Sequence, residues 1–220
     1  MAARAADATV AMDRMYRHQR HIYDLTRKFY LFGRDRLIRD LAPPAGARVC
    51  EIGCGTARNL VKLARRHPAI ALYGIDASAE MLKTADAAIA RAGLVGRIET
   101  RRCLAEPLDP ARTFALGEKF DTVICSYALS MIPGWRAALE RALAVLKPGG
   151  RLDVVDFWNA TSLPGWLRRL LRGWLALFDV TPRPEIADHL RALAAERGGH
   201  LVVERILAGY AFHITYWKAG

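Results

Sequence analysis

A glycine loop between a short apolar run and a helical pattern constrains the fold of this chain more than any other feature. Residues 48–52 have the pattern of a buried strand, and Gly53-Cys54-Gly55-Thr56 follows directly. Glycines at this place let the backbone turn sharply and let a ligand approach it closely. Asp76 ends the next apolar run, where a carboxylate can accept hydrogen bonds from ribose hydroxyls. Arg58 takes the place of the third glycine of a dinucleotide fingerprint, which argues against a pyrophosphate-containing ligand.

Strand and helix patterns alternate after this loop. We expect five strands, a C-terminal hairpin of two more strands, and helices between them. The strands are expected at 48–52, 69–75, 97–103, 120–126 and 151–157, the hairpin at 200–207 and 210–217, and the helices at 57–66, 79–92, 135–146 and 185–197, with a turn at 147–150. Such alternation requires right-handed crossovers, which favour parallel pairing. The pattern therefore predicts an α/β, Rossmann-like chain with a seven-stranded, mostly parallel sheet, helices on both faces and an edge hairpin.

Length and composition predict one domain that spans residues 1–220. The chain has 220 residues, of which 52% are hydrophobic and 25% charged, enough apolar material for a full core. We see neither an apolar run long enough to cross a membrane nor a secretory signal. The four cysteines show neither a disulfide ladder nor a CxxC metal knuckle, so we expect no metal site and a reducing, cytoplasmic environment.

The charge of the chain favours an anionic partner. The formal net charge is +11, and residues 1–48 hold ten Lys or Arg against five Asp. Such an excess suits nucleic acid or an anionic lipid surface. Residues 10–32 and 34–41 have helical patterns, and we interpret 1–42 as a helical lid that also contacts a membrane.

Residues 163–180 form a second basic segment that is strongly amphipathic. Its apolar residues share a stripe at helical spacing, and Arg168, Arg169 and Arg172 lie off that stripe. Trp and Arg around an apolar stripe are typical of a helix that lies in a headgroup layer. A core-facing helix with a solvated basic side is the alternative. The two basic segments predict peripheral association with the inner face of the cell membrane.

The loop and its surroundings resemble the class I S-adenosylmethionine-dependent methyltransferases. The resemblance covers about residues 48–157 and rests on Glu51-x-Gly53-x-Gly55, on Asp76, and on Leu146-Lys147-Pro148-Gly149-Gly150 before the fifth strand. It implies S-adenosylmethionine as cofactor.

The same resemblance assigns residues to the cofactor. Gly53, Cys54 and Gly55 would lie under its methionine and ribose, Glu51 would organise the loop or the amino group, and Asp76 would bind the ribose. Ala77 and Met81 would border the adenine, and Leu104 and Ala105 would recognise it through their backbone, because Cys103-Leu104-Ala105 stand where the family often has Asp. Ser126 and Tyr127 would lie where the methyl group meets its acceptor.

A closer resemblance concerns the acceptor. The segments 16–35 and 126–133, together with Val155-Asp156-Phe157 and Gly209-Tyr210-Ala211, look like the bacterial diacylglyceryl-homoserine N-methyltransferases over about residues 12–216. Those enzymes place three methyl groups on one amine and complete the betaine lipid diacylglyceryl-trimethylhomoserine. The resemblance implies a lipid substrate at an anionic surface, and functional coupling to the enzyme that makes diacylglyceryl-homoserine.

Tyrosines could enclose both the cofactor and the amine. Tyr16, Tyr23 and Tyr30 recur every seven residues and so share one helical face. We expect Tyr23 and Tyr30 near the cofactor, and Tyr16 and Tyr127 as the catalytic pair near the amine, where aromatic faces stabilise a cation. Packing of the helix against the domain is the alternative for each of them. Asp156 would either bind the substrate ammonium or only end the fifth strand.

Four other functions stay open at this point. A phosphatidylethanolamine N-methyltransferase would need the same fold, membrane contact and aromatic cage. A quinone-ring C-methyltransferase would need a base for a phenolic proton. An RNA methyltransferase would suit the charge, although we see no RNA-binding module, and a non-enzymatic S-adenosylmethionine sensor would need only the cofactor site.

Overall fold

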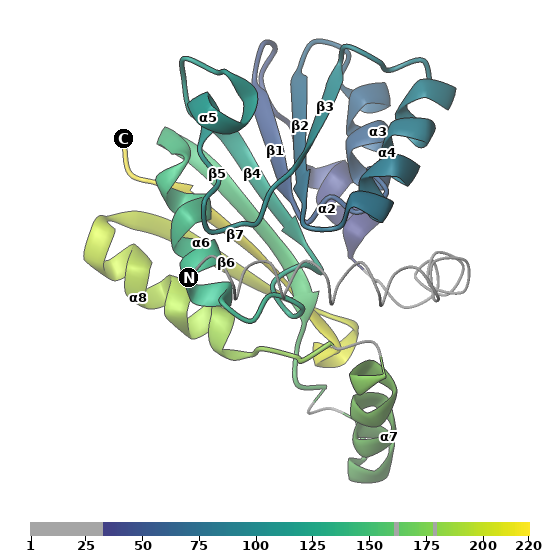
Figure 1. Ribbon diagram of the computed structural model, residues 1–220. Coiled ribbons are helices and arrows are strands. Elements are labelled where there is room, and N and C mark those ends of the chain that lie inside the picture. The colour runs from purple at the N-terminus through teal and green to yellow at the C-terminus, as the bar shows by residue number, and fades with distance from the viewer. Residues whose placement is uncertain (1–32, 161–162, 178–179) are drawn as a thin grey trace.

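The protein is built on one seven-stranded sheet (Figure 1). The computed structural model describes residues 33–160, 163–177 and 180–220. The strands are β1 (Arg48–Ile52), β2 (Ala71–Asp76), β3 (Ile98–Arg102), β4 (Phe120–Ser126), β5 (Leu146–Phe157), β6 (Gly199–Ile206) and β7 (Ala211–Lys218). Their order across the sheet is β3-β2-β1-β4-β5-β7-β6.

Pairing in the sheet is mostly parallel. The first five strands pair in parallel, whereas β7 lies between β5 and β6 and is antiparallel to both. The helices are α2 (Arg34–Asp40), α3 (Arg58–Arg66), α4 (Ala79–Arg91), α5 (Pro110–Phe114), α6 (Trp135–Ala144), α7 (Gly165–Ala176) and α8 (Glu185–Arg197). The predicted sheet, its parallel majority and the C-terminal edge hairpin are confirmed.

Helices cover both faces of the sheet (Figure 1). On one face, α5, α6 and α8 bury apolar side chains such as Phe114, Leu139 and Leu190 against the strands. On the other face, α2, α3 and α4 do so, with side chains such as Leu37 and Leu60. The crossover helices lie on the faces of the sheet. The carboxyl ends of β1, β2 and β4 are therefore left open at one end of the strands, where ligands bind in such folds.

The expected turn at 147–150 lies inside β5. Leu146 already pairs with Phe120 in parallel, and the register shifts between Phe120 and Thr122 before regular pairing continues. Gly149 has φ +70°, so the turn residues form an irregularity within the strand. The prediction of a separate turn was therefore wrong, because a local turn signal does not exclude strand pairing on either side of it.

Helix α5 was missed by the sequence analysis. Its five residues are too few for a periodic signal, but its start is well defined, since Asp109 accepts a hydrogen bond from the backbone N–H of Arg112 at 2.9 Å and Pro110 follows. The Asp109-Pro110 pair is a typical helix start, so the sequence did contain a signal for α5.

The amphipathic segment 163–180 forms a shorter helix than expected, α7. Leu175 is buried, whereas Trp166, Leu170 and Leu177 are exposed. The apolar residues of α7 lie on one broad stripe, of which one border meets the body of the protein and the other faces solvent. Most of the expected lid at 1–42 lies outside the described residues, as do Tyr16, Tyr23 and Tyr30.

Among the described residues, none of the helices combines the length and the apolar character that crossing a bilayer requires.

Candidate functional site

The glycine loop is fixed to the neighbouring strand by its backbone. Gly53 and Gly55 have φ +71° and +53°, in the left-handed region that favours glycine. The N–H groups of Gly53 and Cys54 both donate to the carbonyl of Ile75 at 2.9 Å. A Cβ on Gly53 would lie 2.6 Å from the Cβ of Ala128, so only a glycine lets the loop approach the segment after β4.

Asp76 holds the same loop from the end of β2. Its carboxylate accepts hydrogen bonds from the N–H groups of Gly55 at 2.8 Å and of Ser78 at 2.9 Å. A carboxylate has about four acceptor positions, so it can accept hydrogen bonds from several donors at once. Since the N–H of Cys103 donates to the Asp76 carbonyl at 3.1 Å, the segment after β3 begins beside it.

The Glu51 side chain connects the strand before the glycine loop to the helix after it. It is buried and accepts a hydrogen bond from the Asn59 amide at 2.6 Å, which ties β1 to the first turn of α3. Of the two roles expected for Glu51, this contact favours organisation of the loop.

Ser126 and Tyr127 end β4 at the same edge of the sheet. In the described part of the chain the buried Oγ of Ser126 has no hydrogen-bond partner, a costly state that a ligand could relieve. Tyr127 has φ +55°, which is strained for a residue with a bulky side chain. Its N–H donates to Val155 at 2.7 Å, and its ring meets Phe157 edge-on at 4.7 Å. Such strain often marks a functional position.

Asp156, at the end of β5, holds the segment after β4. Its two carboxylate oxygens accept hydrogen bonds from the N–H groups of Ser130 at 2.9 Å and of Phe157 at 2.8 Å. Burial raises its pKa from 3.8 to about 6, although the hydrogen bonds from Ser130 and Phe157 lower it. Asp156 is buried, and its contacts favour positioning of residues 127–131 over direct binding of a substrate ammonium.

This burial predicts a measurable pH dependence of stability. Between pH 4 and 6 the unfolded chain has released the Asp156 proton while the native chain retains it, so the stability contribution is lost as pH rises. We expect the unfolding free energy of the wild type, relative to Asp156→Asn, to fall by on the order of 3 kcal/mol from pH 4 to pH 7. Urea unfolding of both proteins across this range measures the difference. A difference that stays constant would show that Asp156 titrates normally.

Buried carboxylates give this edge of the sheet a negative character. Burial, followed by the charges of Asp76 and Glu51, raises the pKa of the Cys54 thiol well above its ordinary value. Burial, followed by Asp156 and Glu51, does the same for Cys125. The two thiols therefore stay protonated and are poor nucleophiles, while the carboxylates suit a ligand that carries positive charge.

The structure brings most of the expected cofactor residues to this edge. Ala77 follows Asp76, and the N–H of Met81 is capped by the Ser78 hydroxyl at 3.3 Å. Leu104 is partly exposed, whereas the side chain of Ala105 packs in the core. Cys54 is also buried in the core, so its part in the site is structural.

Three contributors were missed in the sequence. Asn59 is a buried polar residue on an otherwise apolar face of α3, a signal that was available. Gly74 was not, because its role depends on a close approach: a Cβ there would lie 2.9 Å from the Cys54 sulfur. Ala128, which faces Gly53, could likewise be recognised only in three dimensions.

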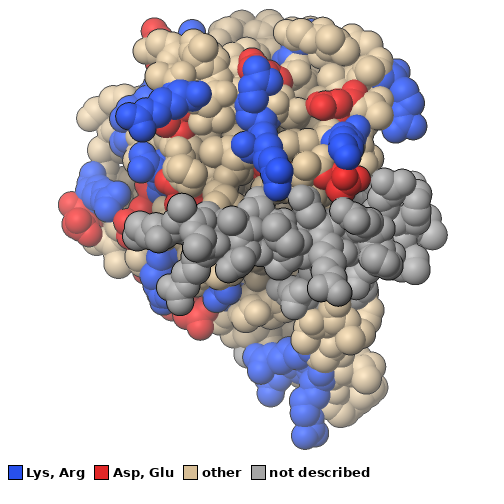
Figure 2. Space-filling model, in the orientation of Figure 1, with Lys and Arg blue, Asp and Glu red and all other residues tan. Residues whose placement is uncertain are grey.

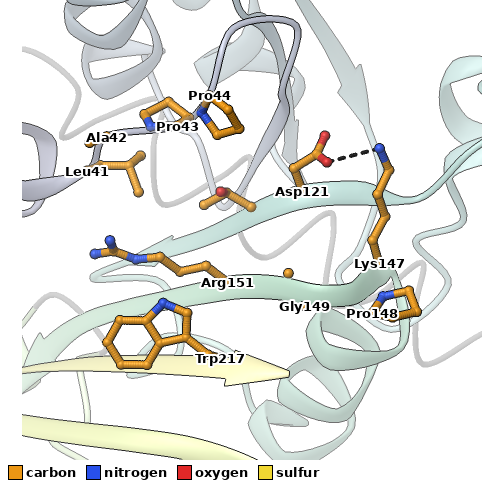
Figure 3. Close-up of a pocket in the computed structure, with 12 residues that line it drawn as sticks. Leu41, Ala42, Pro43, Pro44, Asp121, Lys147, Pro148, Gly149, Arg151 and Trp217 are labelled. Carbon is orange, nitrogen blue, oxygen red and sulfur yellow. Dashed lines mark ion pairs between the residues drawn. The ribbon is translucent and has the colours of Figure 1, made fainter. Parts of the chain in front are cut away.

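A pocket of about 290 Å³ lies at the opposite end of the strands, near the starts of β4 and β5. Its walls come from the connection before β1, from the starts of β4 and β5, and from Trp217 at the end of β7. Figure 3 shows Lys147 reaching Asp121, an ion pair of 2.9 Å. This pocket is remote from the glycine loop and therefore does not belong to the site described above.

Comparison with known proteins identifies the family. A model described as a methyltransferase domain matches residues 49–150. The demethylmenaquinone methyltransferase of Corynebacterium glutamicum is 32% identical over 188 residues, which cover 77% of this chain and 73% of the relative. The chain is a class I S-adenosylmethionine-dependent methyltransferase.

Other relatives of this methyltransferase differ in what they act on. The ubiquinone/menaquinone biosynthesis C-methyltransferase of Syntrophotalea carbinolica is 30% identical over 145 residues, and the match spans 64% of this chain but 58% of that relative. The solved structure of the plantazolicin methyltransferase BpumL, in complex with a monoazolic desmethylPZN analogue and S-adenosylhomocysteine, superposes with a TM-score of 0.69 at 13% identity, and the match covers 99% of this chain and 98% of that one. Likeness at that identity shows the fold alone.

The cofactor of the enzyme is S-adenosylmethionine, and the site fits it. The Asp76 carboxylate at the strand end suits the ribose hydroxyls. The left-handed φ of Gly53 and Gly55 lets the loop turn tightly where a ligand approaches the backbone. The nearby buried carboxylates suit a sulfonium cation.

Proposed function

We propose that this enzyme methylates the amine of diacylglyceryl-homoserine three times and so forms the betaine lipid diacylglyceryl-trimethylhomoserine. One observation supports the proposal: three of the four segments in which the sequence resembles enzymes of that reaction, 126–133, 155–157 and 209–211, lie side by side at the carboxyl ends of β4 and β5. Tyr127 contacts Phe157 at 4.7 Å, Phe157 contacts Tyr210 at 5.7 Å, and the N–H of Trp158 donates to the Tyr210 carbonyl at 2.9 Å. Three motifs that lie far apart in the sequence thus form one aromatic cluster.

The residues of the chain would act mainly by positioning and by excluding water. S-adenosylmethionine supplies a methyl group on a positively charged sulfur. We assign its binding to Gly53, Gly55 and Asp76, with Glu51 and Cys54 as support for the loop. Ala77, Met81, Leu104 and Ala105 would surround the adenine.

The amine must be neutral before each transfer, and burial beside an apolar cluster favours the neutral form of an amine. Each transfer leaves a cationic nitrogen, which an aromatic face stabilises by roughly 0.5–2 kcal/mol. Burial raises the pKa of Tyr127 well above its ordinary value, so its hydroxyl stays protonated. Tyr127 would therefore serve as an aromatic wall and hydrogen-bond donor, not as a base. Tyr16 keeps its proposed place beside the amine.

A quinone-ring C-methyltransferase is the second candidate, favoured by the names of the relatives from Corynebacterium glutamicum and Syntrophotalea carbinolica. It would use the same cofactor site with a flat aromatic acceptor. The two proposals differ in the chemical nature of the product, so one assay separates them.

The full chain, incubated with methyl-labelled S-adenosylmethionine in detergent micelles, should be offered diacylglyceryl-homoserine, phosphatidylethanolamine, a demethylated quinone and RNA in parallel. We expect label in the homoserine lipid, with mono-, di- and trimethyl products in sequence by mass spectrometry. Asp76→Ala serves as the background control. Label in the quinone, the ethanolamine lipid or RNA, with none in the homoserine lipid, would replace the proposal by the corresponding alternative. Failure to label any acceptor, by protein that binds S-adenosylhomocysteine, would favour a sensor.

A further inference from the structure

Helix α7 presents an apolar stripe to solvent. Trp166, Leu170 and Leu177 are 66%, 68% and 71% exposed, and their spacing places them on one side of the helix. Gly173 lies on the same side, and a Cβ there would meet nothing within 4 Å. The neighbouring side of α7 meets the body of the protein through Leu171, Trp174 and Leu175.

Basic residues border this stripe. Arg169 and Arg172 are exposed, and Arg168 is partly so. Within the described part of the chain these three arginines take part in no ion pair, and the sequence has no Asp or Glu from 158 to 178. Figure 2 shows basic side chains along one flank of the projecting helix, with uncharged surface beside them.

Both ends of α7 are tied to the acceptor side of the site. Before the helix, the N–H of Ala160 donates to the Gly209 carbonyl at 2.9 Å. After it, the N–H of Thr181 donates to the carbonyl of Ser130 at 3.1 Å, and Ser130 is the residue that Asp156 holds. Whatever α7 binds is therefore brought next to residues 127–131, which follow β4 and which we assign to the acceptor side of the site.

We propose that the outward stripe of α7, defined by Trp166, Leu170 and Leu177, docks the enzyme on an anionic lipid membrane. The stripe would lie among the acyl chains below the headgroups, and Arg169 and Arg172 would contact lipid phosphates. The proposal rests on the proposed function in that a lipid acceptor gives the docking its purpose.

A second copy of the chain is a poorer partner for this surface. Three side chains on one short helix offer on the order of 400 Å² at full exposure, whereas a stable interface needs about 800 Å² per partner. Arg169 and Arg172 would also lie near the same arginines of the second copy across a symmetric contact, and like charges there repel. A membrane needs only a few inserted apolar groups and a basic flank.

The test is co-sedimentation of the full chain with vesicles, without any methyl acceptor. The vesicles are phosphatidylcholine alone, or phosphatidylcholine with phosphatidylglycerol. The apolar variant is Trp166→Ser/Leu170→Ser, matched by Val95→Ser, which removes an equally exposed apolar side chain (74%) elsewhere. The charge variant is Arg169→Gln/Arg172→Gln, matched by Arg65→Gln/Arg66→Gln in the last turn of α3.

We expect the wild type to bind the anionic vesicles more tightly, and each α7 variant to weaken that binding by about tenfold or more. The matched controls should bind like the wild type, and all variants should retain S-adenosylhomocysteine binding as proof of folding. Wild type that ignores both vesicles, or α7 variants that bind like their controls, would overturn the proposal.

The lipid assay in micelles reports separately on the proposed function. If the enzyme did not methylate the homoserine lipid but bound vesicles through α7, only the proposed acceptor would be refuted. If the enzyme methylated that lipid but its vesicle binding did not depend on α7, only the proposed docking surface would be refuted.

Discussion

Replacing Gly53 by alanine should destabilise the protein by about 3 kcal/mol and weaken S-adenosylhomocysteine binding at least tenfold, from two costs that add. The first is conformational, because Gly53 has φ +71° and a side chain there costs about 1–2 kcal/mol. The second is steric, because the new Cβ would lie 2.6 Å from Ala128, whereas carbon atoms pack at about 3.5–4.0 Å. The loop must then move away from the segment after β4. This movement separates the glycine loop from Ser126 and Tyr127, where the methyl acceptor is expected. Urea unfolding and titration calorimetry measure the two effects.

Gly149→Ala is the matched control for this prediction. Gly149 has φ +70°, almost the value of Gly53, but its Cβ would meet nothing within 4 Å. It should show only the conformational cost and bind the ligand normally. Adding Ala128→Gly to Gly53→Ala should restore part of the lost stability and affinity. If the control lost as much as Gly53→Ala, or if Ala128→Gly restored nothing, the close approach would not be the cause.

The architecture could be predicted from sequence because its signals are local and repeated. Three of the four crossovers between residues 48 and 157 show an apolar run, a helical pattern and a breaker in the sequence, and this alternation leaves few topologies open. The glycine loop and Asp76 were recognisable for the same reason, since their chemistry depends on positions fixed by strand ends. Where a local signal competed with pairing, as at 147–150 within β5, the pairing prevailed.

Contacts between distant segments could not be predicted in this way. Ala128 opposite Gly53 and Ser130 on Asp156 join residues from different crossovers, and no spacing in the sequence encodes them. The same limit applied to α7. Its apolar residues were visible in the sequence, but their division between a core side and an outward side depends on where the helix meets the sheet.

Asp76→Ala should weaken S-adenosylhomocysteine binding by about 100-fold and reduce methyl transfer accordingly. Two losses combine in this substitution. The ribose would lose a charged acceptor, and hydrogen bonds to charged groups contribute about 1.5–3 kcal/mol. The N–H groups of Gly55 and Ser78 would lose the carboxylate that accepts them at 2.8 and 2.9 Å, which loosens the loop itself. Titration calorimetry with the purified full chain measures the affinity.

Asp109→Ala separates these losses from the general cost of removing a carboxylate that caps backbone N–H groups. Asp109 accepts a hydrogen bond from the Arg112 N–H at 2.9 Å at the start of α5, away from the glycine loop. Its removal should cost about 1 kcal/mol of stability and leave ligand affinity unchanged. Asp76→Asn keeps the shape but has a single acceptor oxygen, so it should bind with intermediate affinity. If Asp76→Ala bound as tightly as Asp109→Ala, the ribose would have to be held by other groups, and Asp76 would keep only its structural contacts with Gly55 and Ser78.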